Sequence, residues 1–304
     1  MRQGDFVVRK SYGGDVLFRI DGFVRHSAIL KGTDYRLLAD APFSDLEVVD
    51  DPESTGAVRE VRVKEHETMR RFQRQTQRLH EEREGEPAGR GTPPTADMYF
   101  DVPGRVLHLD GDGLYMRKSM QLYGQLRVPA HGVHAHESQM PDLLRRLLPR
   151  IQPDIVVITG HDGVLKHPPG GVEDTAHRPQ EGFQHLSSYK NSLNFVNAVR
   201  VAREYDRNRD SLVVVAGACQ SHFEALLQAG ANFASSPGRI LIHALDPVYI
   251  AVKASHTSIR DTISLADIVR GTISGAEGVG GIETMGKHRI GLPRPKTVQK
   301  AALM

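Results

Sequence analysis

The sequence predicts an α/β protein in which a mostly parallel sheet carries helices on both faces and follows a small N-terminal β-barrel. Two patterns predict this class. Over residues 98–260, nearly continuous apolar strands alternate with amphipathic helices, as in parallel sheets that are covered on both sides. Over residues 1–55, short strands are separated by glycine-containing turns, as in small barrels. A chain of 304 residues is long enough for both parts.

Residues 1–55 are expected to form an SH3-like barrel. Turn chemistry at Gly13-Gly14 and at Gly32 separates its strands. The strands are predicted over residues 5–9, 15–20, 36–40 and 46–49. A barrel of this kind more often docks a partner than performs chemistry. We therefore expect an interaction module, with a packing role that needs no ligand as the equal alternative.

Residues 56–97 are expected to form a charged helix followed by a flexible linker. Between Glu60 and Glu84, acidic and basic side chains are mixed at helical spacing, which favours a solvated helix over a nucleic-acid surface. The formal net charge of +2 also gives no reason to expect a nucleic-acid partner. Glycine and proline in residues 85–94 cannot continue a helix. This exposed, arginine-rich and loosely held segment is therefore an easy place for proteolytic cleavage.

Residues 98–260 are expected to form the main α/β domain, and periodicity assigns its elements. Strands are predicted at residues 105–109, 132–137, 155–158, 213–216, 240–242 and 248–252. Helices are predicted over residues 114–126, from Pro141, from about Ser187 and around residues 223–227. Residues 261–304 are rich in glycine, and we expect them to complete or cover the active site.

The only cysteine, Cys219, stands where a predicted strand gives way to a helix. The positive end of a helix stabilises a thiolate and makes the sulfur a nucleophile. His161 follows an earlier apolar strand, and parallel strands end at the same edge of a sheet. A thiol and an imidazole at one edge predict a cysteine peptidase. The alternative is that Cys219 is a small buried hydrophobic residue, as many free cysteines are.

Both strand ends resemble those of the caspase-like cysteine peptidases, in which one apolar strand ends in His-Gly and a later one in Ala-Cys. Here Asp162 follows the histidine directly, where those enzymes usually have glycine, and Gly163 comes one residue later. The pair Gln220-Ser221 after the cysteine also differs from the caspase version. The resemblance implies a caspase-like fold for residues 98–260.

A closer resemblance covers nearly the whole chain, and it is to the YabG family of sporulation-specific peptidases of spore-forming Firmicutes. The motifs that carry it are residues 4–12, 15–20, 159–163 and 217–221. The resemblance implies a mother-cell cysteine endopeptidase that processes spore-coat proteins, located in the cytoplasm in association with the forming coat. In that family, the catalytic roles correspond to His161 and Cys219 here.

The implied mechanism is acyl transfer without a metal or an organic cofactor. Cys219 attacks the scissile carbonyl, His161 acts as general acid and base, and water releases the acyl-enzyme. The oxyanion is expected to meet backbone N–H groups of Gly160, Asp162, Gly163 and Cys219 itself.

Acidic residues near the strand ends leave two roles open. One role is to orient His161, for which the candidates are Asp110, Asp112 and Glu137. The other is to bind a basic side chain at P1, the residue before the cleaved bond. Asp162 and Asp246 are the candidates for this second role, and ordinary loop capping is at least as good an interpretation of both. With a basic P1, the arginine-rich segment from Arg70 to Arg90 is an expected site of self-cleavage.

Other functions compete with this interpretation. A class I glutaminase-like hydrolase also places a cysteine at a strand-to-helix turn, and here its histidine would be His243 or His256. A non-catalytic spore-coat assembly protein would use the barrel for docking. A metal site could use residues 131–137, which include His131, His134, His136 and Glu137, although polar strand-end histidines are favoured. Residues 281–288 match a P-loop by chance, because His288 replaces its Ser or Thr.

Composition also bears on location and partners. One cysteine cannot form an intrachain disulfide, which favours a reducing compartment. The N-terminus lacks the apolar core of a signal peptide, and no apolar run is long enough to span a membrane. We therefore expect a soluble intracellular protein whose partners are protein substrates, with neither nucleic acid nor membrane bound. The oligomeric state stays open.

Overall fold

The computed structural model describes residues 1–84, 99–164 and 185–292. The N-terminal part is a five-stranded antiparallel sheet in the order β4-β3-β2-β1-β5. Its strands are β1 Phe6–Arg9, β2 Phe18–Val24, β3 Ser27–Gly32, β4 Leu38–Pro42 and β5 Leu46–Val48. One face buries a small core that includes Val7, Phe18, Ile20 and Leu30. No pairing between β4 and β5 joins the two edges within the described part of the chain.

The sequence reasoning missed β3, although its burial alternates along the strand as expected for a half-buried strand. It also began the next strand at residue 36, whereas β4 begins at Leu38. Residues 33–37 instead leave this sheet and pack against the second part of the molecule. The side chain of Arg36 is fully buried there.

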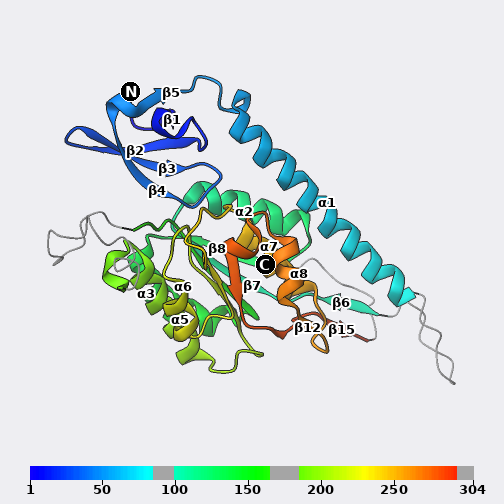
Figure 1. Ribbon diagram of the computed structural model, residues 1–304. Helices are drawn as coiled ribbons and strands as arrows, with labels where there is room; N and C mark the ends of the chain where they lie inside the picture. The colour runs from blue at the N-terminus through cyan, green and yellow to red at the C-terminus, as the bar shows by residue number, and fades with distance from the viewer. Residues whose placement is uncertain (85–98, 165–184, 293–304) are drawn as a thin grey trace.

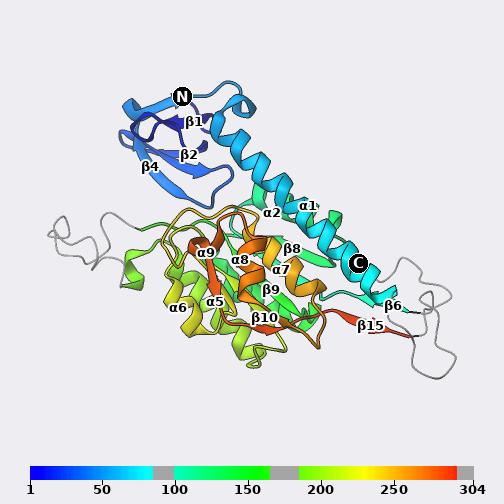
Figure 2. The same ribbon diagram turned by 45° about the vertical axis from the view of Figure 1, so that its right-hand side comes forward.

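The charged helix predicted after the N-terminal strands is α1, Gly56–Glu84. In Figures 1 and 2 it runs from the N-terminal sheet along the side of the second part of the molecule. Met69 packs there against the main core, and Arg71 donates to the Arg270 carbonyl at 3.2 Å. The predicted linker, from residue 85 on, lies outside the described residues. Among the helices that the structure describes, none combines the length and apolar character of a membrane span.

The second part is built on a six-stranded sheet in the order β8-β7-β9-β10-β11-β13. The strands are β7 Val106–Asp110, β8 Ala130–His134, β9 Ile155–Thr159, β10 Val213–Ala216, β11 Phe233–Ser235 and β13 Val279–Gly281. All pairings are parallel except that of the edge strand β13 with β11. The mostly parallel sheet expected from the sequence is therefore confirmed.

Helices cover both faces of this sheet, as the alternating pattern predicts (Figure 2). One face packs against α2 Gly113–Gln125, α7 Asp246–His256 and α8 Leu265–Gly271. The other packs against α3 Met140–Ile151, α5 Ser192–Tyr205 and α6 Phe223–Ala229. Short elements complete the fold: β6 Phe100–Val102 with β15 Arg289–Gly291, β12 Thr262–Ile263 with β14 Thr284–Met285, and α9 Gly275–Gly278.

The strands predicted at residues 240–242 and 248–252 are wrong. Residues 240–242 form no sheet strand, and residues 248–252 lie inside α7. This helix is buried on nearly every side, so its sequence shows no polar face. Its continuous apolar run is also the pattern of a buried strand. Pro247 at its first turn is compatible with a helix start.

The chain order of the strands defines where a ligand would bind. From β7 the chain passes outward to β8 and then back across to β9, so the strand order reverses between β7 and β9. In open α/β sheets, ligands bind outside the carboxyl ends of the strands at such a point. Residues 110–112, 160–163 and 217–221 follow the strands there, and residues 33–37 of the N-terminal part pack against them.

Truncating the α3 face should destabilise the fold. Leu144 is fully buried among the side chains between α3, α5 and the sheet. Leu144→Ala is expected to lower the free energy of unfolding by about 2–5 kcal/mol, because it leaves a cavity in this core. Chemical denaturation followed by circular dichroism measures the change. Leu193→Ala is the control, because Leu193 on α5 is 49% exposed, and an equal loss in both variants would contradict the core assignment.

Candidate active site

Cys219 lies at the carboxyl end of β10, and a tight turn brings it there. Gly217 has φ 112°, and a Cβ at this position would lie 2.9 Å from the Leu226 side chain. Glycine is therefore required for both its conformation and its packing. The Cys219 thiol is fully buried and faces the Ile242 peptide. Its Sγ lies 3.2 Å from the Ile242 nitrogen, which donates to it, and 3.5 Å from the Ile242 oxygen.

His161 lies at the carboxyl end of the adjacent strand β9. Ile158 and Ala216 are partners in the β9–β10 pairing, and His161 and Cys219 each follow their member of this pair by three positions. The imidazole is 2% exposed and stacks on the Tyr115 ring with centroids 5.2 Å apart. Within the part of the chain that the structure describes, neither ring nitrogen has a hydrogen-bond partner.

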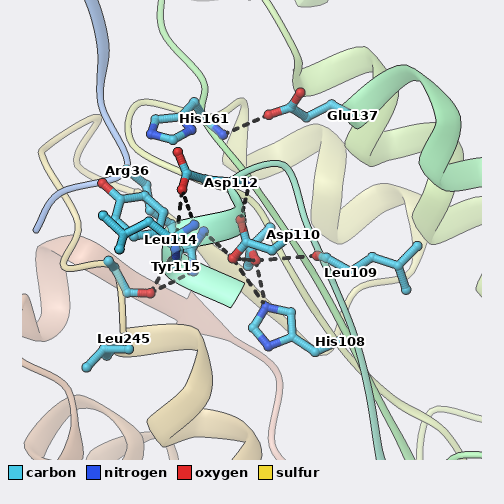
Figure 3. A network of polar contacts seen from close by, with 12 residues as sticks. Arg36, His108, Leu109, Asp110, Asp112, Leu114, Tyr115, Glu137, His161 and Leu245 are labelled. Atoms are coloured by element: carbon cyan, nitrogen blue, oxygen red, sulfur yellow. Dashed lines mark hydrogen bonds and ion pairs between the residues drawn. The ribbon is translucent and has the colours of Figure 1, made fainter. Parts of the chain in front are cut away.

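Glu137 holds the backbone of His161 and not its ring. Its Oε1 accepts from the His161 N–H at 3.0 Å (Figure 3). A Cβ on Gly111 or on Gly160 would lie 2.1 or 2.5 Å from the same oxygen, so both glycines make room for the carboxylate. Asp112 instead caps α2, accepting from Leu114 N–H at 2.7 Å. Neither carboxylate orients the imidazole by a hydrogen bond in this conformation.

Burial sets the protonation of both groups. Removal from water lowers the pKa of His161 to about 4, although the nearby Asp112 charge opposes this shift. Burial raises the pKa of the Cys219 thiol to about 12, against the opposing influence of the Ile242 backbone and the Arg36 charge. At neutral pH this conformation therefore holds a neutral imidazole and a protonated thiol, which is not the reactive ion pair.

Asp162 joins the loop after β9 to the loop after β10. Its carboxylate is fully buried and accepts from the Ser221 hydroxyl at 2.9 Å and the Asn191 N–H at 2.8 Å. It also accepts from the Ser192 hydroxyl and from the Gly163 N–H. Burial nevertheless raises its pKa to about 6, since these donors only partly offset the loss of water. A carboxylate that accepts four hydrogen bonds does not face a P1 side chain in this conformation.

Asp246, the other predicted P1 ligand, is also occupied. It is fully buried at the start of α7 and accepts from the backbone N–H groups of Ile273 and Ser274 at 2.7 and 3.1 Å. The capping interpretation therefore fits both aspartates better than substrate binding. The Gly163 N–H donates to Asp162 and does not point to an oxyanion here. The oxyanion roles of Gly160, Asp162 and Cys219 stay predictions.

The sequence reasoning missed the group that lies between these loops, the side chain of Arg36. It forms an ion pair with Asp110 at 2.8 Å, and both side chains are fully buried (Figure 3). Arg36 Nε and Nη2 also donate to the Ala244 carbonyl at 3.0 and 2.7 Å. Burial by itself would raise the pKa of Asp110, but the Arg36 charge and the His108 contact outweigh it and hold that pKa well below its usual range.

A polar network supports Asp110 from the sheet side. The Thr159 hydroxyl donates to its Oδ2 at 3.0 Å, and the Asp112 N–H donates to its Oδ1 at 2.9 Å. His108 lies 3.6 Å from the same carboxylate and 3.2 Å from the Tyr123 hydroxyl. Asp110 is thus directed to Arg36 and not to His161. The only signal in the sequence for the Arg36–Asp110 ion pair was an aspartate at the end of a parallel strand.

The residues that the alternative functions would need either have other contacts or do not form the required site. His243 pairs through Nε2 with Glu65 at 3.2 Å and accepts at Nδ1 from Leu245, while His256 contacts the Leu126 carbonyl at 3.0 Å. Over residues 1–84, 99–164 and 185–292, no group of three or more His, Cys, Asp or Glu side chains is arranged to hold a metal. Residues 281–288 contain strand β14 and no helix, unlike a P-loop.

Comparison with known proteins gives one family. The model of the YabG peptidase family U57 matches residues 2–293. The chain is 43% identical over 295 residues to the sporulation-specific protease YabG of Bacillus subtilis (strain 168), covering 95% of this chain and 97% of the relative. No solved structure matches the chain.

The buried thiol should react slowly. At pH 8, iodoacetamide is expected to alkylate Cys219 of the folded chain about 100-fold or more slowly than in the same chain unfolded in guanidinium, because thiolate is scarce and the sulfur is covered. Cys219 is the only cysteine, so intact mass gives the rate without ambiguity. Equal rates in the two states would contradict the buried site.

His161 should make the fold sensitive to acid. Its pKa is about 4 in the folded chain against an ordinary 6.5, so the unfolded chain binds more protons between these values. Stability is then lost as the pH falls from 6.5 to 4, by about 3 kcal/mol. His161→Gln should remove this part of the pH dependence, measured by denaturant unfolding at several pH values. His26→Gln, at an exposed turn, is the control, and an unchanged slope in His161→Gln would contradict the assignment.

Proposed function

The chain belongs to the YabG peptidase family and is a peptidase, and from this premise we propose that it cleaves peptide bonds through Cys219 and His161. His161 accepts the proton of the Cys219 thiol, the thiolate sulfur attacks the scissile carbonyl carbon, and the carbon–nitrogen bond breaks. The leaving amine takes a proton from His161, and His161 then deprotonates the water that hydrolyses the thioester. The products are a carboxylic acid and a free amine, with the thiol regenerated.

One observation carries this assignment: thiol and imidazole follow adjacent parallel strands at the carboxyl edge of the sheet. The ring nitrogens of His161 are not engaged by the described residues, so they are available for proton transfer. The competing His243 accepts at Nδ1 from Leu245 N–H, and its Nε2 lies 3.2 Å from Glu65 Oε1 without a hydrogen bond. The site therefore favours the peptidase arrangement over the glutaminase-like one.

The caspase-like interpretation belongs to this proposal. Its support is the order of the two groups, with histidine after one central strand and cysteine after the next, on a sheet with helices on both faces. Family membership sets aside the non-catalytic assembly protein as a description of the chain.

The relative from B. subtilis is named as a sporulation-specific protease. We propose the same setting here: cleavage of spore-coat proteins in the mother cell, at the forming coat. Cleavage after a basic residue, and self-cleavage between Arg70 and Arg90, stay predictions that peptide-library profiling and intact mass would test. Neither Asp162 nor Asp246 supports the basic preference in this conformation, because both carboxylates are occupied.

Substitution of the two catalytic residues tests the proposal directly. Cys219→Ala and His161→Ala should each lower the rate of cleavage of a purified spore-coat protein by about 10³-fold or more, because each removes a group that acts in every turnover. Gel electrophoresis and mass spectrometry follow the cleavage. His243→Ala is the matched control and should keep substantial activity. Full activity in either catalytic variant, or loss only in His243→Ala, would overturn the assignment.

A further inference from the structure

Residues 33–38 lie across the candidate active site, and we call them the strap. They join β3 to β4 and include Leu38, the first residue of β4. The strap leaves the N-terminal sheet and runs between the loops after β9 and after β11. Tyr35 forms an antiparallel bridge with His243 on one side, and Leu37 forms a parallel bridge with Asp162 on the other. The strap is thus an extended segment that is paired on both sides, in the way that peptides add to exposed strand edges.

The backbone of the strap reaches the thiol. Arg36 N–H donates to the Ile242 carbonyl at 3.2 Å, and this oxygen also lies 3.5 Å from Cys219 Sγ. On either side, the Asp34 backbone carbonyl accepts from Ala244 N–H at 2.7 Å, and Leu38 N–H donates to the Asp162 backbone carbonyl at 3.5 Å. The Arg36–Leu37 peptide unit therefore lies between two loops. One carries Ile242, the residue that contacts the thiol, and the other carries His161.

The side chain of Arg36 fills a pocket beside the histidine. Its guanidinium carbon lies 5.0 Å from the centre of the Tyr115 ring, the same ring on which His161 stacks. Asp110 closes the pocket at the strand end, and the Ala244 carbonyl accepts two of the guanidinium donors. Figure 3 shows Arg36, Asp110 and His161 in this one cluster. The pocket thus combines a charge, a carbonyl and an aromatic face that all suit a guanidinium.

We propose that the strap is a built-in pseudosubstrate: Arg36 occupies the pocket for a substrate arginine, and the chain is held inactive until the strap leaves the site. This inference rests on the proposed function, since it takes Cys219 and His161 as the catalytic pair. In it, Asp110 is the carboxylate that selects the arginine, the role for which the sequence suggested Asp162 and Asp246.

The burial of the two residues supports this interpretation. An apolar side chain could join two sheets without the desolvation of a buried ion pair, which often contributes little net stability. The chain instead places an arginine at the strand ends, where open α/β sheets bind ligands. Once the strap leaves, Asp110 would be an unpaired buried carboxylate, and a substrate arginine would restore its partner.

The closed conformation is consistent with an inactive state. The strap covers a thiol that is fully buried and an imidazole that is 2% exposed. An occupant on the same chain has an effective concentration in the millimolar range, so weak binding is enough to exclude a dilute substrate. A cleft of about 380 Å³ lies alongside residues 37–40, between the N-terminal sheet and Val164, Gln220 and Leu241, and gives access to this end of the strap.

Alkylation of the single cysteine tests the proposal without relying on activity. Arg36→Ala should increase the rate of Cys219 alkylation by iodoacetamide at least about 10-fold, because the strap loses its anchor and water reaches the sulfur. Arg25→Ala, at the exposed turn before β3, is the matched control and should leave the rate unchanged. An unchanged rate in a folded Arg36→Ala chain would overturn the proposal.

A peptide added in trans tests the pocket. The hexapeptide Thr-Asp-Tyr-Arg-Leu-Leu, which is the strap sequence, should slow alkylation of the Arg36→Ala chain and compete with an arginine-containing substrate. The same peptide with alanine in place of arginine should have little effect. Arg36→Ala should also lower the KM for that substrate, since the internal competitor is gone. Equal effects of the two peptides would overturn the arginine pocket.

A second variant tests the strap if the Arg36→Ala chain does not fold. Arg36→Met combined with Asp110→Asn removes both charges, so no carboxylate is left buried alone. Faster alkylation in this double variant supports the strap, and an unchanged rate overturns it. Failure of the proposed function has a different signature, because Cys219→Ala would then keep its activity whatever the alkylation rates are.

Discussion

The buried ion pair between Arg36 and Asp110 is the interaction on which the arrangement of the two sheets depends. Taking both charges out of water is unfavourable, and the pair persists because each group has further partners. Arg36 donates to Ala244 and faces the Tyr115 ring, while Asp110 accepts from Thr159 and from a backbone N–H. Removing either partner would leave the other charge uncompensated, which typically destabilises by about 3–5 kcal/mol. This ion pair therefore links the N-terminal sheet and the strap to the loops around the covered thiol.

The carboxylates around the site mainly organise the backbone. Glu137 holds the His161 peptide, Asp112 caps α2, and Asp162 connects the loops that follow β9 and β10. These contacts account for a carboxylate directly after His161: the Asp162 side chain turns inward and accepts from four donors. Among the residues the structure describes, none hydrogen-bonds to the His161 ring, so a third catalytic group is not built into this conformation.

Membership in the YabG peptidase family is compatible with a candidate site that is covered in this conformation. Under the proposal that the chain cleaves spore-coat proteins, a closed form would keep it from cleaving them early. In this chain the cover is part of the N-terminal sheet, which the sequence suggested as an interaction module. Binding of a partner to that sheet would then bear directly on the position of Arg36, because β3 and β4 carry the two ends of the strap.

The sequence alone determined the elements that depend on local pattern. Apolar runs located β7, β9 and β10, and helical periodicity located α2 and α3. Position at strand ends was enough to single out His161 and Cys219, because parallel strands share an edge. The pattern failed where burial is complete: α7 has no polar face, so its apolar run was taken for a strand.

Only the tertiary structure decided what surrounds those two residues. Arg36 and Ala244 are 208 positions apart in the chain, and no local pattern links them. The pKa values of His161 and Cys219 are set mainly by burial in the assembled molecule, and the charge of Arg36, which is distant in the sequence, acts on both. Strand ends are local properties of a sequence, whereas the exclusion of water and the pairing of buried charges are properties of the assembled molecule.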